Sequence, residues 1–199
     1  MMPNNKKKVV AVTGGIASGK NIVGDIIKEC GYDVFDCDTI THELNKKGMP
    51  CYNVIIKTFG NGFLDNSGEL DKKAFSKFVF ADKKNVELLN KITHPLIFEE
   101  IDKKIVNAKS NFVFVLIPLL FETNMQNNFY KIWTVSADEE TRINRAINRD
   151  NITRQQAKNI IKNQISEIER NKLADTIIYN DRTVKELKDN ILNALKNLE

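Results

Sequence analysis

The feature that most constrains the fold is a glycine-rich loop between an apolar segment and an amphipathic one. The apolar residues Val9–Thr13 predict a short buried strand, and the loop follows over Gly14–Gly19. From Lys20 to Cys30 the apolar residues recur with a helical period, and Gly31 predicts the end of that helix. Tyr32–Phe35 predicts a second strand. A strand, loop, helix and second strand in this order indicate a parallel α/β sheet.

The loop has the spacing of a phosphate-binding motif. Residues Gly14–Lys20 (GGIASGK) match GxxxxGK, the start of the Walker A pattern. Glycines allow the tight turn that aims several main-chain N–H groups at one anion, and the helix that follows presents the positive end of its dipole to the same place. Lys20 adds a cation for the β- and γ-phosphates. The alternative is a chance glycine loop, which the flanking strand and helix disfavour.

One position departs from this pattern. The residue after the lysine is normally Ser or Thr, whose hydroxyl binds Mg²⁺, but here it is Asn21, followed by Ile22. Phosphate binding through main-chain N–H groups and Lys20 does not depend on that hydroxyl. An Asn carbonyl oxygen can bind a hard cation, although its longer side chain changes the reach. We therefore expect Asn21 to bind Mg²⁺ weakly and the activity to be retained.

The remaining segments predict a core with two helical additions. Residues 39–109 are mainly helical and too long for one crossover, so they predict an inserted subdomain. The continuous apolar run Phe112–Ile117 predicts a central strand buried on both faces. Shorter strands are expected at Ile132–Val135 and Thr176–Tyr179, with a basic helical lid over 139–171 between them. Within residues 7–199 we expect a P-loop NTPase-type three-layer α/β sandwich with a parallel sheet, whose core comprises about 7–38, 110–138 and 172–199.

The apolar run Phe112–Ile117 also excludes a class of protein. It ends in Pro118, so the aspartate that motor ATPases and GTPases place after this strand to hold Mg²⁺ is missing. Small-molecule kinases are therefore favoured.

Composition narrows the function classes further. The chain has 199 residues, of which 42% are hydrophobic and 28% charged, and this suits one globular unit. A net charge of +4 fits a phosphate-bearing ligand and is too small to argue for nucleic acid. Three cysteines without a CxxC pair, and two histidines, disfavour a disulfide framework or a zinc site. Without a signal-peptide core or a membrane-length apolar segment, we expect a cytoplasmic protein that binds no membrane.

Beyond these patterns, the chain resembles the dephospho-CoA kinase family from about Lys8 to the final helix. Each short motif is weak alone, but their order and spacing together are specific. The matching residues are VTGGIASGK, Asp36-Cys37-Asp38, His94-Pro95-Leu96-Ile97, Pro118-Leu119-Leu120-Phe121-Glu122, Arg145, Arg149-Asp150, Thr153-Arg154, Gln164, Ala174-Asp175 and Ile178-Tyr179-Asn180. The chain departs from the family where Arg170 replaces a frequent Lys and where Asp181-Arg182 replace a glycine-containing turn.

The resemblance implies phosphorylation of the 3′-hydroxyl of dephospho-CoA with ATP and Mg²⁺, the last step of coenzyme A biosynthesis. The expected substrates are ATP and dephospho-CoA, and the expected state is a monomer that binds no nucleic acid. Two alternatives stay open. One is a P-loop kinase for a nucleoside or another small alcohol, and the other is an ATP-binding regulator that has lost catalysis, which the departure at Asn21 motivates.

Asp38 is the expected catalytic base. It lies just past the carboxyl end of the second strand, where open α/β sheets hold ligands, and a carboxylate there can accept the proton of an attacking hydroxyl. The resemblance points to the same residue, as a contact for the acceptor and, through water, for Mg²⁺. Asp38 could instead only cap the helix that follows. Asp36 either helps to hold Mg²⁺ through water or only ends the strand.

Arginines of the predicted lid are the next candidates. Arg142, Arg145 and Arg149 are three and four residues apart, which places them on one helix face, and Arg154 follows. Together with Lys20, Arg145 and Arg149 are expected to stabilise the transferring phosphoryl group, and Arg145 also to contact the acceptor. A solvated basic face is the alternative, and it applies most strongly to Arg142.

The remaining expectations concern contacts with the two substrates. His94 is either an acceptor contact, as the family suggests, or a structural histidine, with Pro95 beginning a helix. Most phenylalanines of the insertion should form its core, with one or two touching the pantetheine arm. Adenine is expected near the turn at Asn180. The expected ATP-binding residues are Gly15, Ile16, Ala17, Ser18, Gly19, Lys20, Asn21, Ile22 and Asn180.

Overall fold

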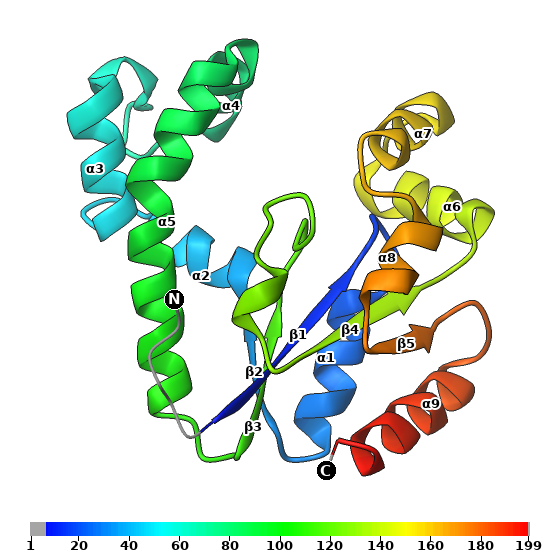
Figure 1. Cartoon of the computed structure of the whole chain (residues 1–199). Helices are drawn as coiled ribbons and strands as arrows, with labels where there is room; N and C mark the ends of the chain where they lie inside the picture. Colours follow the sequence, from blue (N-terminus) through cyan, green and yellow to red (C-terminus); the bar gives the residue numbers. More distant parts are fainter. Residues whose placement is uncertain (1–6, 199) are drawn as a thin grey trace. The chain divides into compact units, whose positions relative to one another are not determined.

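A computed structural model describes residues 7–198 (Figure 1). The chain divides into two compact units. The first comprises residues 7–36 and 107–198 and contains the sheet, and the second comprises residues 37–106 and is helical.

The first unit is built on a five-stranded sheet in the order β2-β3-β1-β4-β5. All four strand pairs are parallel, with Val10 of β1 aligned with Phe114 of β3 and with Lys131 of β4. The predicted parallel α/β sheet is therefore confirmed. The strands span β1 Lys8–Gly14, β2 Asp33–Asp36, β3 Phe112–Leu116, β4 Lys131–Ser136 and β5 Thr176–Tyr179.

Helices cover both faces of this sheet because its strands are apolar on both sides. Side chains at alternate positions of β1 and β4, including Val10, Val12 and Trp133, pack into one core with α1 (Lys20–Glu29) and α9 (Val184–Lys196). Ser136 points to the opposite face, where its hydroxyl contacts α8 (Glu167–Leu173). The three layers agree with the predicted sandwich.

Two helices between β4 and α8 pack on the glycine-rich loop. They are α6 (Glu139–Asp150) and α7 (Arg154–Lys162), and each begins at a capping residue, Asp138 and Thr153 respectively. Their shared core of Ile143, Ala146 and Ala157 is joined by the loop residues Ile16 and Ala17. The predicted lid, residues 139–171, is thus three short helices, the first two of which contact the loop directly.

The second unit consists of α2 (Cys37–Leu44), α3 (Pro50–Phe59), α4 (Lys72–Ala81) and α5 (Lys83–Val106), together with the short 3₁₀ turn η1 (Asn61–Phe63). A second 3₁₀ turn, η2 (Gln126–Asn128), belongs to the first unit. The core of the helical unit combines aliphatic and aromatic side chains. Phe59 and Phe63 each meet Phe75 with ring centroids 5.4 Å apart, whereas Phe80 is 76% exposed.

The expectation that Pro95 begins a helix is wrong. Helix α5 continues through Pro95, although proline removes one main-chain hydrogen bond and costs on the order of 3 kcal/mol inside a helix. The helical turns before and after Pro95 contain buried side chains, some of them hydrogen-bonded. Thr93 donates its hydroxyl to Leu89 O at 2.8 Å, and Ile101 and Ile105 are fully buried. Packing of the helix against α2, α3 and α4 therefore outweighs the local effect of proline.

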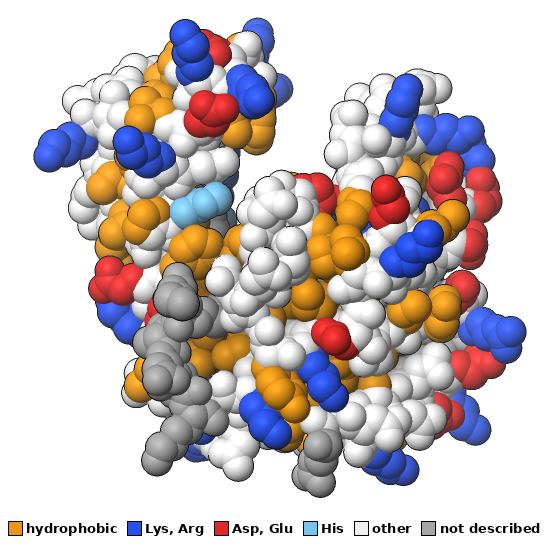
Figure 2. Space-filling view, in the orientation of Figure 1, with side chains coloured by type: hydrophobic (Ala, Val, Ile, Leu, Met, Phe, Trp, Pro, Cys, Tyr) orange, Lys and Arg blue, Asp and Glu red, His pale blue; other side chains and the backbone are white. Residues whose placement is uncertain are grey.

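Within residues 7–198, no helix is both long and apolar enough to cross a membrane. On the face shown in Figure 2, Lys and Arg side chains are scattered among Asp and Glu side chains and do not gather in one patch.

Candidate active site

The phosphate loop connects β1 to α1 and contains two residues with left-handed backbone. Gly19 has φ of 98° and Ala17 has φ of 56°. The N–H of Ser18 donates to Gly15 O at 3.1 Å, which closes a turn within the loop. Gly19 adopts its angle without steric cost, whereas Ala17 stores on the order of 1 kcal/mol of strain. Such strain is typical of loops in which main-chain N–H groups converge on an anion.

Buried polar atoms without a hydrogen-bond partner lie on this loop and on helix α6. Among the described residues they include Lys20 Nζ, Ser18 Oγ, Arg142 Nε and Arg145 Nη1. Three of these four atoms belong to cationic side chains. A buried cation without a partner is costly, since it loses water and gains no compensating hydrogen bond. These donors therefore suit an anion, and the phosphates of a nucleotide offer several acceptor oxygens.

The loop is closely enclosed, so that a side chain at Gly15 or at Gly19 would require a neighbouring side chain to move. A Cβ at Gly15 would overlap the guanidinium of Arg142, and a Cβ at Gly19 would overlap the side-chain amide of Asn180. Side chains from α6 and from the residue after β5 thus occupy the space that a Cβ would need at these two positions.

A buried cluster of two arginines and one glutamate lies next to Gly15. Arg142 and Arg170 are 4% and 2% exposed, and both face the carboxylate of Glu167, at 3.4 Å and 3.2 Å. Arg170 also donates to Ile165 O at 2.8 Å, and Ser136 donates its hydroxyl to Glu167. Burial lowers the pKa of Arg170, which the negative charge of Glu167 counteracts.

The sequence did not reveal this cluster. A solvated basic face is wrong for Arg142, because that side chain is buried against the loop. A signal was present: Arg142 lies beside Ile143 and one turn before Ala146, on the apolar side of α6. Glu167 and Arg170 are three residues apart, the spacing of an ion pair on one helix face.

The other lid arginines differ in their surroundings. Arg145 is half-buried and its Nη1 has no partner among the described residues. Arg149 is 62% exposed and donates two hydrogen bonds of 2.8 Å to Asp150, whose pKa it lowers. Arg154 donates to the exposed Glu140 at 2.7 Å. Of these three, Arg145 is the one with a buried guanidinium nitrogen that is available to an anion.

Two polar side chains attach the lid to the rest of the unit. The side-chain oxygen of Gln164 accepts a hydrogen bond from Ile16 N at 2.9 Å, at the tip of the phosphate loop. The carboxylate of Glu122 accepts one from Ile165 N at 3.1 Å. Both bonds span large sequence separations, so they fix the end of α7 to the loop and to the segment after β3.

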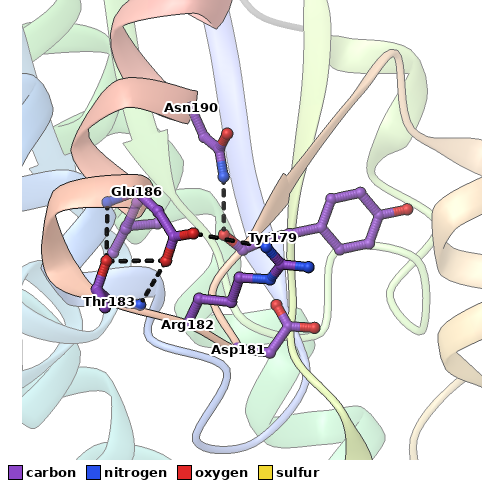
Figure 3. A pocket seen from close by; sticks show the side chains of 7 residues that line it. Tyr179, Asp181, Arg182, Thr183, Glu186 and Asn190 are labelled. Atoms are coloured by element: carbon purple, nitrogen blue, oxygen red, sulfur yellow. Dashed lines mark hydrogen bonds and ion pairs between the residues drawn. The ribbon is translucent and has the colours of Figure 1, made fainter.

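A cavity of about 370 Å³ lies at the turn between β5 and α9 (Figure 3). Thr183 and Glu186 form a capping box at the start of α9, and Arg182 lies 3.5 Å from Glu186. Asn190 donates to Tyr179 O at 3.4 Å, which ties the helix back to the strand. The lining residues are Tyr179, Asp181, Arg182, Thr183, Glu186, Leu187 and Asn190.

The other predicted site residues, Asp38 and His94, lie in the helical unit. β2 extends to Asp36 and α2 begins at Cys37, so Asp38 is the second residue of the helix and not the residue that caps it. Its carboxylate lies in the first turn, where the helix dipole favours a negative charge. His94 is half-buried in α5, with its ring 5.7 Å from that of Phe98, and burial lowers its pKa.

A parallel sheet with a glycine loop after its central strand, a buried unpartnered lysine in that loop and no aspartate after β3 define a P-loop kinase. The family model "Dephospho-CoA kinase" matches residues 8–186. The chain therefore belongs to the dephospho-CoA kinase family.

Curated relatives match along nearly their whole length. A dephospho-CoA kinase of Carboxydothermus hydrogenoformans is 36% identical over 191 residues, which cover 94% of this chain and 93% of the relative. One of Fusobacterium nucleatum is 39% identical over 180 residues, covering 90% and 92%.

Solved structures show the same architecture. A dephospho-CoA kinase from Campylobacter jejuni superposes with a TM-score of 0.69 at 26% identity, covering 96% of this chain and 97% of that one. A shikimate kinase from Acinetobacter baumannii reaches a TM-score of 0.55 at 14% identity, covering 96% and 93%, and shows the fold alone.

Proposed function

We propose that this chain transfers the γ-phosphoryl group of ATP to the 3′-hydroxyl of dephospho-CoA, giving coenzyme A and ADP. The buried Lys20 ammonium without a partner carries the proposal, because it marks an anion site within the phosphate loop. Membership of the dephospho-CoA kinase family supports the choice of acceptor.

The nucleotide is proposed to lie along the loop from Gly15 to Ile22. Main-chain N–H groups of this segment and Lys20 hold the β- and γ-phosphates. The adenine then lies near the turn at Asn180, where the cavity beside β5 and α9 offers an aromatic side chain, Tyr179, and polar groups.

Mg²⁺ is proposed to accompany ATP. Asn21 is exposed in the first turn of α1, and its carbonyl oxygen is a suitable donor for a hard cation. Asp38 is proposed as a further contact through water. When bound, the ion neutralises charge on the phosphate oxygens. The chain's own residues do the rest of the positioning.

The chemistry is an in-line displacement. The 3′-oxygen forms a bond to the γ-phosphorus as the bond from that phosphorus to the β,γ-bridging oxygen breaks, and ADP leaves with the bond's electron pair. Asp38 orients the hydroxyl and accepts its proton. Lys20, Arg145 and Arg149 stabilise the negative charge on the transferring group. The helical insertion, proposed as residues 39–109, supplies the acceptor site, including His94.

The segment 139–171 is proposed to act as a lid. Its arginines approach the phosphates as it closes, and closure excludes water, which limits ATP hydrolysis. We also propose a cytoplasmic monomer. Within residues 7–198, the cysteines Cys30, Cys37 and Cys51 form no disulfide, which fits a reducing compartment.

Release of ADP, followed in a coupled assay with saturating ATP, tests the acceptor. We expect dephospho-CoA to raise ADP release at least ~100-fold above that with adenosine or other nucleosides. An equal or larger response to a nucleoside contradicts the proposal and favours the nucleoside-kinase alternative. ATP binding without turnover of any acceptor, even at high Mg²⁺, favours the non-catalytic regulator.

The variant Asp38→Asn tests the base. It keeps the shape of the side chain and removes its ability to accept a proton, so turnover should fall on the order of 10²–10⁴-fold with ATP affinity unchanged. Nearly full turnover in this variant would exclude Asp38 as the base.

A further inference from the structure

The side chain of Asn180 is hydrogen-bonded to the main chain of the phosphate loop. Its main-chain N–H donates to Ser136 O at 2.8 Å, which continues the pairing of β5 with β4 and fixes the residue in place. The side chain is buried, since the residue is only 6% exposed. Its amide nitrogen donates to Ser18 O at 2.7 Å, across 162 residues of sequence. The acceptor is a carbonyl oxygen, so the donor must be the amide nitrogen of Asn180.

This bond sets the direction of the next main-chain N–H group. A trans peptide unit is planar, with its oxygen and its hydrogen on opposite sides, and the peptide bonds of the described residues are all trans. When Ser18 O is held against Asn180, the N–H of Gly19 in the same peptide unit must point the other way. In a phosphate-binding loop, that direction is the concave side, where main-chain N–H groups meet the phosphates.

The absence of a side chain at Gly19 leaves room for the side-chain amide of Asn180. A Cβ at position 19 would overlap the Asn180 amide, and φ of 98° disfavours any other residue there. The close approach of the amide and the left-handed backbone therefore serve one purpose, the orientation of a single peptide unit.

We infer that Asn180 is a positioning residue for the phosphates, which acts by orienting the Gly19 N–H and does not recognise adenine through its side chain. The inference rests on the proposed function, since it assumes that the loop binds the polyphosphate of ATP. It goes beyond the expected nearness of adenine to this turn because it assigns the Asn180 side chain a different partner and a different effect.

Inorganic tripolyphosphate separates the two roles, because it carries the phosphates of ATP without adenine. Binding of ATP and of tripolyphosphate is measured by calorimetry for the wild type, Asn180→Ala and Asn180→Asp, with displacement of tripolyphosphate by ATP to confirm a shared site. Asn180→Ala should weaken both ligands by the same factor, about tenfold. Asn180→Asp keeps the size of the side chain but cannot donate to a carbonyl, so it should lose at least as much affinity.

Asn53→Ala is the matched control. Asn53 likewise donates its side-chain amide to a main-chain oxygen, Gly48 O at 2.9 Å, but does so in the helical unit. It should leave both affinities unchanged.

Three results overturn the inference. They are a loss of ATP affinity with unchanged tripolyphosphate affinity in Asn180→Ala, unchanged affinity for both ligands in that variant, and wild-type affinity in Asn180→Asp. If Asn180→Ala does not fold, the Asn180→Asp result decides. Failure of the wild type to bind either ligand is a different outcome, because it contradicts the proposed function itself.

Discussion

The phosphate loop and the lid that packs on it are built on different principles. The loop works through its main chain, and its small residues leave room for converging N–H groups and for neighbours such as Arg142 and Asn180. The predicted lid instead carries long charged side chains, some buried and some exposed. The first kind of site is set by a few adjacent residues, whereas the second depends on which distant residues surround each charge.

The largest effect is expected at Lys20, where the loop contributes a side chain. Lys20→Met should lower kcat/KM by on the order of 10³-fold, because it removes the only cation of the loop that faces the phosphates. The melting temperature should not fall, because the ammonium has no protein partner to lose. A large loss of stability, measured by thermal unfolding, would show that the ammonium has a structural partner.

Arg145 tests the lid in the same way. Its unpartnered guanidinium nitrogen should meet the transferring phosphoryl group, so Arg145→Ala should lower kcat about 100-fold with a small change in the KM for ATP. The matched control is Lys158→Ala, which removes an exposed positive charge from α7 and should change kcat less than twofold. Equal losses in the two variants would mean that only the overall charge of the lid matters.

Glu167 tests whether the buried charges hold the lid to the sheet. Glu167→Gln removes the carboxylate that faces the buried Arg142 and Arg170, so the free energy of unfolding should fall by about 2–4 kcal/mol. The measurement is urea denaturation, with Glu29→Gln, an exposed carboxylate of the same unit, as the control. Unchanged stability in Glu167→Gln would contradict the role given to this cluster.

A substitution at Asn21 tests how the phosphate loop binds Mg²⁺. Asn21→Ser restores the usual hydroxyl, and we expect the Mg²⁺ concentration for half-maximal rate to fall by a few fold, on the order of 3–10. The measurement is the initial rate across a Mg²⁺ titration at fixed ATP. An unchanged titration curve would mean that Asn21 binds the ion as well as a serine does, or does not bind it.

The smallest effect is expected from His94 in the helical unit. Burial lowers the pKa of His94 below its ordinary value of 6.5, so the unfolded chain binds this proton more readily than the folded one. The free energy of unfolding should therefore fall as the pH drops below about 6.5 and level off below the folded-state pKa. His94→Gln should remove this step, whereas the exposed His42→Gln should keep it.

Asp33 gives a comparison in a different pH range. Hydrogen bonds, chiefly from the Ser110 N–H, lower the pKa of Asp33 below 3.8, so its contribution to stability is lost only as the pH falls through still lower values. As the pH falls, the two steps therefore begin in different ranges, near 6.5 for His94 and only below about 3.8 for Asp33. A wild-type profile without a step near neutral pH would contradict the burial of His94.

Much of the sheet and the loop could be predicted because their signals are local. Short continuous apolar runs predicted the strands, and the GxxxxGK spacing predicted the loop before Lys20. The prediction at Pro95 was wrong because a local rule was applied to a helix that packs against other helices of its unit. The burial of Arg142 and the bond from Asn180 to Ser18 arise from contacts between segments far apart in the sequence. A single sequence contains no direct record of such contacts.

Phosphorus NMR of the complete reaction tests the central claim most directly. With ATP, Mg²⁺ and dephospho-CoA, the γ-phosphate signal should disappear as the signal of a phosphate monoester on the 3′-oxygen and the signals of ADP grow together. Loss of the γ-phosphate to inorganic phosphate, or an ATP spectrum that does not change, would contradict phosphoryl transfer to this acceptor.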